Sequence, residues 1–274
     1  MLKFIVLADI HIVKKDELSH GLDTLDRLNK AVSFVNQNHG DADFIIFAGD
    51  LADRGEAEAY ERFKVAIKQL APPVYITLGN HDHRPTFLEV FGAHLADETG
   101  NVNYIIDTKD HRVIVLDSSD PSERGAGVLE PSQIAWLHSK LQDARELPVI
   151  IVLHHNITKL HVQTDFIILK DNKKFAEAVL SHPNVRQVVS GHVHMTTSGT
   201  YMGVPFSTFA GAHYSIEPTL QLLSGPVPNP VARREGPGQL AVVLSDDEST
   251  VVHMENFLDR HLVMAQDLFR WKST

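Results

Sequence analysis

The sequence predicts an α/β fold in which two mixed β-sheets pack together and helices flank them. Short apolar runs such as residues 44–48 are typical of strands covered on both faces, as in a mostly parallel sheet. Segments with apolar residues at helical spacing alternate with these runs. Residues 103–107 and 112–116 form a predicted hairpin, so the sheets are not purely parallel.

Strands and helices alternate along the first third of the chain. Gly49 lets the strand at 44–48 turn sharply, and Pro72 and Pro73 end the helix before the third strand. Pro85 is typical of the first turn of a helix. In order, the predicted elements are a strand over 3–8, a helix over about 21–38, a strand over 44–48, a helix over about 56–70, a strand over 74–78 and a short helix from about residue 85.

The rest of the chain continues this alternation and ends in a second hairpin. Pro131 opens a predicted helix, and Asn256 is a predicted cap of a last one. Residues 215–238 mix prolines with glycines, so we expect a long loop that is either a lid over a site or a contact in a homo-oligomer. We expect residues 1–274 to form one domain. The other predicted elements are a helix over 173–180 and strands over 149–153, 185–189, 199–201, 205–207, 239–244 and 250–254.

Composition narrows the classes of partner and compartment. The formal net charge of −10 disfavours a nucleic acid polymer as partner, since such binding needs a basic face. The chain has no cysteine, which excludes disulfides, thiolate catalysis and sulfur-ligated metals. The apolar run at the N-terminus is too short for a signal peptide, and no stretch has the length of a membrane span. We therefore expect a soluble, cytoplasmic protein without a membrane partner.

Five predicted strands end in residues that bind metal ions. Because the carboxyl ends of parallel strands meet at one edge of a sheet, we expect these side chains to converge. Carboxylate, imidazole and amide ligands suit zinc, manganese, iron or cobalt, without a preference among them. A carboxylate can bridge two ions about 3.5–4 Å apart, and such a pair clamps an in-line displacement at phosphorus. The residues are Asp9, His11, Asp50, Asn80, His81, His154, His155, His192 and His194.

The order of these motifs resembles that of the calcineurin-like metallophosphoesterases. Chain length and the absence of a large insertion are similar to the bacterial branch that contains cyclic-nucleotide phosphodiesterases and glycerophosphodiesterases. The resemblance implies a four-layer α-β-β-α sandwich and two divalent or trivalent metal ions. The matching segments are Asp9-Ile-His11, Gly49-Asp50-Leu-Ala-Asp53, Gly79-Asn80-His81-Asp82, His154 and Gly191-His192-Val-His194.

The same resemblance implies a role for each residue. His81 faces the phosphate and either stabilises charge or protonates the departing oxygen, and Asp53 orients the His81 ring. Arg54, His155 and His213 are candidates for contact with substrate, as are Asn80 and His81; Arg54 can equally be a solvated turn residue and His213 a packed histidine. Asp9, His11, Asp50 and His194 are the implied ligands of one metal, and Asp50, Asn80, His154 and His192 those of the other, with Asp50 bridging.

One block departs from the family pattern. The family usually has His-His-Pro-Pro in mid-chain, whereas this chain has His154, His155, Asn156 and Ile157. Without the prolines, the path of this loop and the choice between His154 and His155 as ligand stay open. We favour His154, which lies nearer the strand.

These residues predict hydrolysis of a phosphoric ester. We expect a metal-bound hydroxide to attack phosphorus. The resemblance to the bacterial branch implies a small phosphodiester of the cyclic nucleotide or glycerophosphodiester class as substrate. A phosphomonoesterase that acts on small metabolites or phosphoproteins is the alternative. A non-catalytic scaffold that binds proteins is a remote one, since such a scaffold is expected to lose metal ligands.

Overall fold

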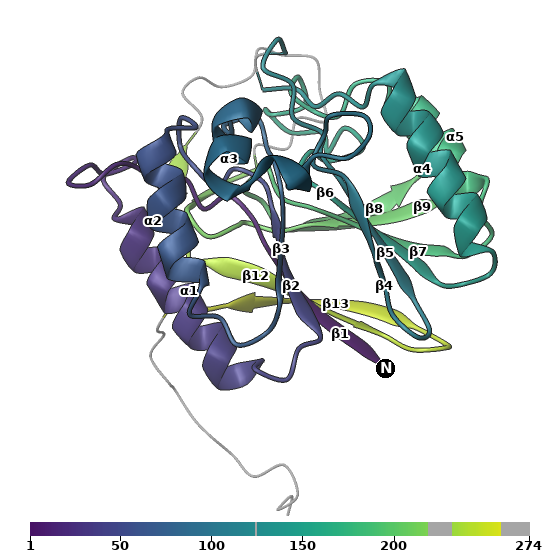
Figure 1. Cartoon of the computed structure of the whole chain (residues 1–274), viewed down its shortest axis with the longest axis horizontal. Coiled ribbons are helices and arrows are strands. Elements are labelled where there is room, and N and C mark those ends of the chain that lie inside the picture. The colour runs from purple at the N-terminus through teal and green to yellow at the C-terminus, as the bar shows by residue number, and fades with distance from the viewer. Residues whose placement is uncertain (124, 219–231, 259–274) are drawn as a thin grey trace, which may run out of the picture.

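Two large β-sheets lie face to face, and helices cover the outer face of each, so that the fold has four layers (Figure 1). The structure is a computed structural model, and it describes residues 1–123, 125–218 and 232–258. This arrangement confirms the predicted α-β-β-α sandwich of two mixed sheets. Among the described residues, no helix has the length and apolar character needed to cross a membrane.

The first sheet has the strand order β13-β12-β1-β2-β3. Strands β1, β2 and β3 run parallel, while β12 is antiparallel to both β1 and β13. Helices α1 and α2 cover its outer face (Figure 1). The bounds are β1 Leu2–Leu7, α1 Thr24–Asn38, β2 Phe44–Ala48, α2 Ala57–Ile67, β3 Val74–Thr77, β12 Gln239–Ser245 and β13 Thr250–Asn256.

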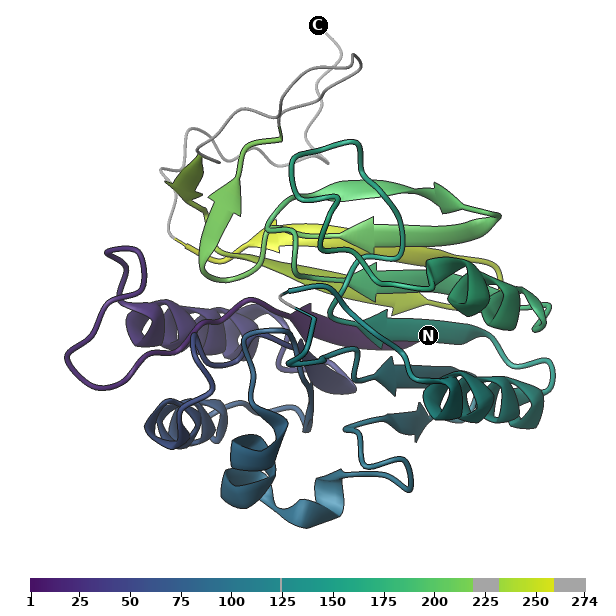
Figure 2. The same ribbon diagram turned by 90° about the horizontal axis from the view of Figure 1, so that it is seen from above.

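The second sheet has the strand order β4-β5-β6-β7-β9-β8. Its central strands β5, β6, β7 and β9 are parallel, and antiparallel strands β4 and β8 form its two edges. Helices α4 and α5 cover its outer face, and Figure 2 shows the two sheets stacked between the helical layers. The bounds are β4 Tyr104–Asp107, β5 Arg112–Leu116, α4 Pro131–Ala144, β6 Val149–Leu153, α5 Asn172–Leu180, β7 Val185–Ser190, β8 Thr197–Tyr201 and β9 Val204–Thr208.

Three apolar clusters correspond to the three interfaces between the layers. One joins α1 and α2 to the first sheet, and another joins α4 and α5 to the second. The third lies between the sheets, where Phe4, Ile46 and Val243 of the first meet Val115 and Val152 of the second. The central strands are buried on both faces, which explains their uninterrupted apolar runs.

Some predicted boundaries and elements were wrong. Helix α1 begins at Thr24, because Ser19 and Leu22 exchange main-chain hydrogen bonds in a tight turn and Asp23 caps the helix. Asn256 ends β13 rather than capping a helix, and the predicted last helix lies outside the described residues.

Part of the predicted loop at 215–238 is ordered. Its flanks form a two-stranded antiparallel sheet of β10 (Tyr214–Ile216) and β11 (Arg233–Glu235). Residues 219–231, on which the lid or interface prediction chiefly falls, lie outside the described residues. Helix α3 (Arg84–Phe91) is followed by a short 3₁₀ helix, η1 (Ala93–Leu95), that was not predicted.

Candidate metal centre

The metal-binding residue types lie at the carboxyl ends of five parallel strands, three from one sheet and two from the other. Main-chain hydrogen bonds join the loops that carry them: Asp9 N donates to Gly49 O (3.1 Å), His11 N to Asp50 O (2.9 Å) and Gly191 N to His154 O (3.1 Å). These bonds join the loop after β1 to that after β2 and the loop after β6 to that after β7, and His192 N, which donates to Asp9 Oδ1 (3.0 Å), joins the two pairs. The four loops therefore form one edge, as expected for a site in an open α/β sheet.

Five of these residues have an unusual backbone conformation. Asp9, His11, Asp50, His192 and His194 have φ between 50° and 71°, in the left-handed region. This region is uncommon for residues other than glycine, and it clusters at functional sites where surrounding contacts hold it in place. Here it turns each chain sharply after its strand, so that the side chains meet.

The first group of side chains consists of Asp9, His11, His194 and Asp50. His194 Nε2 lies 3.5 Å from Asp9 Oδ1, and His11 Nε2 lies 3.6 Å from Asp50 Oδ2. All four are buried. His11 Nε2 has no hydrogen-bond partner among the described residues, although it is shielded from solvent. A buried nitrogen of this kind needs a ligand, and a metal ion between these side chains supplies one.

The second group shares Asp50 and adds Asn80, His154 and His192. His154 Nε2 lies 3.3 Å from the same Oδ2 of Asp50, 3.2 Å from Asn80 Oδ1 and 3.2 Å from His192 Nδ1. Asp50 Oδ2 thus faces both groups. Its other oxygen accepts a hydrogen bond from His81 N at 2.8 Å, which fixes the carboxylate.

In three of the histidine rings, one nitrogen bonds to a main-chain carbonyl, so the other nitrogen faces the centre. His154 Nδ1 donates to Ala48 O, His194 Nδ1 to Tyr214 O and His192 Nε2 to Ile167 O, each at 2.9 Å. Because a carbonyl oxygen only accepts, that nitrogen carries a hydrogen, so the lone pair of each ring in its neutral form points inward. Such a second hydrogen bond is typical of histidines that bind metals.

The electrostatics of the centre favour a bound cation. Burial lowers the pKa of His192 to about 3 and keeps the pKa of His194 well below its usual value, so both rings are neutral. Burial opposes the charged form of His154, but Asp50 and Asp9 outweigh it and raise its pKa to about 9. Burial also raises the pKa of Asp9 to about 7. Carboxylates and neutral imidazoles enclosed together stabilise positive charge, so the residues fit metal ions.

His81 and Asp53 lie beside the centre. The His81 side chain is exposed, and its Nδ1 donates to the main-chain carbonyl of Asp53 at 2.7 Å. The Asp53 carboxylate instead accepts from His11 Nδ1 (3.2 Å) and from Ser19 Oγ (3.0 Å). Asp53 therefore contacts the His81 ring through its main chain, while its carboxylate contacts His11.

Burial opposes ionisation of Asp53, but the hydrogen bond from His11 outweighs it and lowers the Asp53 pKa to about 2. For His81, loss of water on the part of the ring that faces the protein disfavours the charged form, yet Asp50, the Asp53 carbonyl and the carboxylates of Asp53 and Asp82 raise its pKa. The raised pKa favours the protonated form of the His81 ring, which lies beside the cluster.

Three predicted substrate contacts differ in their surroundings. Arg54 is exposed, with Nε 3.8 Å from Asp53 Oδ2. His155 is buried, its Nδ1 lies 2.7 Å from Ser118 Oγ, and its ring lies 4.5 Å from that of His192. His213 is buried with Nε2 bonded to Ser19 O at 3.1 Å. His154 Nε2 thus lies beside Asp50, whereas His155 Nδ1 lies beside Ser118 and its ring is grouped with those of His154 and His192.

A family model described as calcineurin-like phosphoesterase matches residues 2–196, well over half of the chain. The chain belongs to this family. A relative from Rhodococcus erythropolis, named "probable cyclic nucleotide phosphodiesterase", is 32% identical over 215 residues, which cover 76% of this chain and 70% of the relative. A "probable glycerophosphodiester phosphodiesterase" from Arcobacter nitrofigilis is 26% identical over a match that covers 77% of this chain and 78% of the relative.

Solved structures support the same fold. A dimetal phosphatase from Danio rerio superposes with a TM-score of 0.67 at 14% identity, covering 94% of this chain and 97% of the other. The chain is a metal-dependent phosphoester hydrolase of the calcineurin-like family, and its His and Asp clusters are of a kind that can hold metal ions.

Two residues of this phosphoesterase were not assigned from sequence. The carboxylate of Asp82 accepts hydrogen bonds from the main-chain N–H groups of Leu51 (3.1 Å) and Gly79 (2.9 Å) and from Tyr60 Oη (3.1 Å). It thereby ties the loop after β2 to the loop after β3. The Tyr214 ring stacks on the His194 ring with centroids 4.0 Å apart and planes at 6°. Only the position of Asp82, two residues after Asn80, hinted at such a role.

Proposed function

We propose that this chain hydrolyses small phosphodiesters at a pair of metal ions held by Asp9, His11, Asp50, Asn80, His154, His192 and His194. The observation that carries the proposal is the position of Asp50, whose Oδ2 lies 3.6 Å from His11 Nε2 and 3.3 Å from His154 Nε2. One carboxylate oxygen placed between two sets of nitrogen and oxygen donors suits a bridging ligand.

The ligand types set the class of ion. Every donor is a carboxylate, imidazole or amide, and the chain has no cysteine. Iron, manganese, zinc and cobalt all accept such donors, and we propose that the two sites are filled from this group. Ions of this kind, when bound, neutralise phosphoryl oxygens and activate water for attack on phosphorus.

A side chain of the protein supplies the proton that the departing oxygen needs. His81 is held by the Asp53 carbonyl through Nδ1, which leaves Nε2 to face the ester. From this position we propose that Nε2 donates its proton to the departing alkoxide oxygen. Asp53 acts twice, through its carbonyl on His81 and through its carboxylate on His11.

Two exposed apolar residues are adjacent in sequence to residues that contact the centre. Phe166 is 79% exposed and precedes Ile167, whose carbonyl holds the His192 ring. Leu18 is 61% exposed and precedes Ser19, whose hydroxyl donates to Asp53. Exposed apolar side chains next to a polar centre suit a substrate that carries an organic group on both sides of phosphorus. The relatives named as cyclic nucleotide and glycerophosphodiester phosphodiesterases support the same class.

Two substrates with one leaving group test the proposal. Metal-reconstituted protein is assayed with bis(p-nitrophenyl) phosphate and with p-nitrophenyl phosphate. We expect kcat/KM for the diester to exceed that for the monoester at least tenfold. The reverse preference would identify a phosphomonoesterase. A screen of cyclic nucleotides against glycerophosphodiesters then separates the two diester classes.

A further inference from the structure

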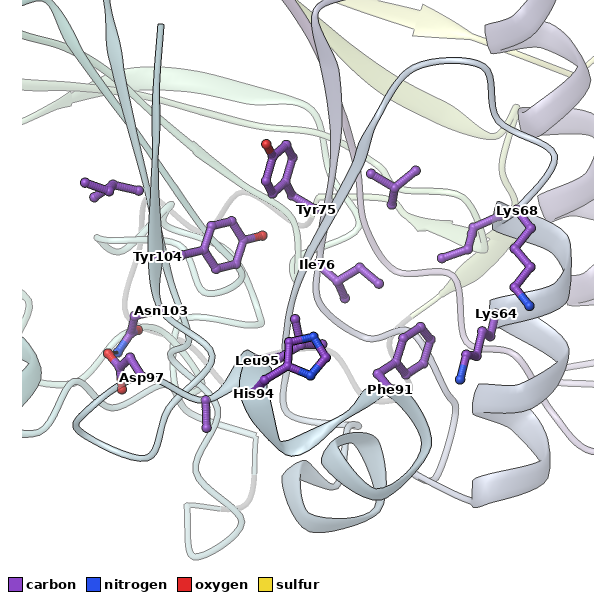
Figure 3. A pocket seen from close by; sticks show the side chains of 14 residues that line it. Lys64, Lys68, Tyr75, Ile76, Phe91, His94, Leu95, Asp97, Asn103 and Tyr104 are labelled. Carbon is purple, nitrogen blue, oxygen red and sulfur yellow. Dashed lines mark hydrogen bonds between the residues drawn. The ribbon is translucent and has the colours of Figure 1, made fainter.

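A cavity of about 610 Å³ opens on the side of the molecule where β3 and β4 form neighbouring edges of the two sheets. Figure 3 shows its walls: Lys64 of α2 and Lys68, which directly follows α2, lie on one side, and Tyr75 and Tyr104 lie on the other. None of its lining residues belongs to the metal-binding clusters. The volume is within the range of sites for small organic ligands.

The lining is apolar and aromatic. Phe91 and Leu95 close one end, and the rings of Tyr75 and Tyr104 stack with centroids 5.7 Å apart and planes at 28°. Tyr75, Phe91, Leu95 and Tyr104 are only half buried, although each is large and apolar or aromatic. Faces of this kind favour a flat aromatic ligand, which gains contact with the rings while covering the apolar side chains.

One buried polar atom in the cavity lacks a partner. The Tyr104 hydroxyl is shielded from solvent and makes no hydrogen bond among the described residues. The main chain of Ile76 approaches the hydroxyl oxygen as a donor, which leaves the hydroxyl hydrogen without an acceptor among the described residues, and Figure 3 shows the hydroxyl turned toward Ile76. Unpaired buried hydroxyls are uncommon, and a ligand in the cavity is one source of the missing partner.

The charges around the opening favour an anion. Lys68 lines the cavity and is exposed, and its side-chain ammonium has no hydrogen bond or ion pair within the described part of the chain. The acidic lining residue, Asp97, accepts hydrogen bonds from Thr99 N (2.8 Å) and Asn103 Nδ2 (2.9 Å), so its carboxylate is already engaged. The cavity thus has a positively charged side chain at its opening, although the formal net charge of the chain is −10.

We propose that this cavity is a second ligand site that takes a small aromatic monoanion, with the ring system against Tyr75, Phe91 and Tyr104 and the acidic head near Lys68. Such a ligand buries the half-exposed rings and pairs the free lysine. The site is separate from the metal centre, although β3 and α3, which both supply lining residues, flank the loop that carries Asn80 and His81.

Two fluorescent probes that differ by one sulfonate test the proposal. These are 1-anilinonaphthalene-8-sulfonate and its neutral analogue N-phenyl-1-naphthylamine, titrated into the metal-loaded protein. We expect one saturable site for the sulfonate, with a Kd of about 10–100 µM for a ligand of this size. The neutral analogue is expected to bind about two- to fivefold more weakly, the usual range for one partly exposed ion pair.

Variants locate the site. Lys68→Gln is expected to remove the preference for the sulfonate, and Leu95→Glu to weaken both probes at least about tenfold by placing a charge against the rings. Lys173→Gln on α5, an exposed lysine of the opposite helical layer, is the matched control and should change neither Kd. Circular dichroism establishes that Leu95→Glu is folded, and Lys68→Gln tests the site without altering the core.

Three results would overturn the proposal. One is the absence of saturable binding to the wild-type protein. A second is equal affinity for the sulfonate in the wild type, Lys68→Gln and Leu95→Glu. The third is loss of probe binding in Asp50→Ala, which would place the probe at the metal centre. A wild-type dimer that Leu95→Glu dissociates in sedimentation, with no probe bound, would instead assign this face to a second copy of the chain.

Discussion

Asp53 holds the His81 ring through its main-chain carbonyl, 2.7 Å from Nδ1, and leaves its carboxylate to contact His11. The main chain and the side chain of Asp53 therefore have different partners. A change of the side chain therefore disturbs His11 while the link to His81 remains.

Substitution of Asp53 should thus act on the metal centre. Asp53→Ala removes the acceptor of His11 Nδ1, and the ring is then free to turn or change tautomer. We expect metal affinity to fall about 10- to 100-fold, as for other residues that orient a ligating histidine, and Asp53→Asn, which keeps an acceptor oxygen, to lose less. Metal titration by calorimetry measures this, with the exposed Asp143→Ala on α4 as control. Unchanged affinity with impaired turnover would contradict it.

Asp50 and His81 should have different effects on metal content and turnover. Asp50→Ala removes the oxygen that faces both donor groups, so we expect it to lose binuclear binding together with activity. His81→Ala removes a proton donor that lies outside the proposed ligands, so we expect two ions per chain and a fall in kcat of about 100-fold or more. Elemental analysis of both purified proteins provides the test. Equal metal loss in the two variants would be inconsistent with these roles.

Asp82 should matter for stability more than for chemistry. Asp82→Ala leaves the N–H groups of Leu51 and Gly79 without their acceptor, at about 1–3 kcal/mol for each buried group. We expect the melting temperature to fall by several degrees. Tyr60→Phe, which deletes only the hydroxyl that bonds Asp82, is the milder comparison at about 1 kcal/mol. Thermal unfolding of the metal-free proteins measures both, and an unchanged melting temperature for Asp82→Ala would refute the role.

Phe166 should influence the choice of diester. If its exposed ring contacts the second ester group, Phe166→Ala raises KM for bis(p-nitrophenyl) phosphate about three- to tenfold and changes KM for methyl p-nitrophenyl phosphate less. Met202→Ala, at an exposed position between β8 and β9, is the matched control. A uniform change with both substrates would show that Phe166 does not distinguish the ester groups.

The strand ends were predictable because their signals are local. A buried apolar run followed by Gly49 and Asp50 specifies a strand, a turn and a ligand type within a few residues, and the parallel order of such strands brings their ends together. The β10–β11 pair was missed because Tyr214 and Glu235 lie far apart in sequence and in segments without strand periodicity.

The contacts of Asp53 and Asp82 were not predictable in detail. Whether Asp53 meets His81 through its carboxylate or its carbonyl depends on the path of the loop after β2, which no residue pattern describes. Asp82 acts as an acceptor only because the loops after β2 and β3 are adjacent in the folded protein. Sequence motifs therefore indicated the kinds of residues in the centre, and the hydrogen bonds that orient them required the structure.

The most direct test of the two-metal proposal is the number of ions bound per chain, measured by elemental analysis alongside phosphodiesterase activity as chelated protein is reloaded with manganese. We predict no activity in the metal-free protein and a rise in activity that saturates at two ions per chain. Full activity in protein shown to be free of metal would contradict the proposal. Activity that saturates without ions bound at the seven side chains would also contradict it.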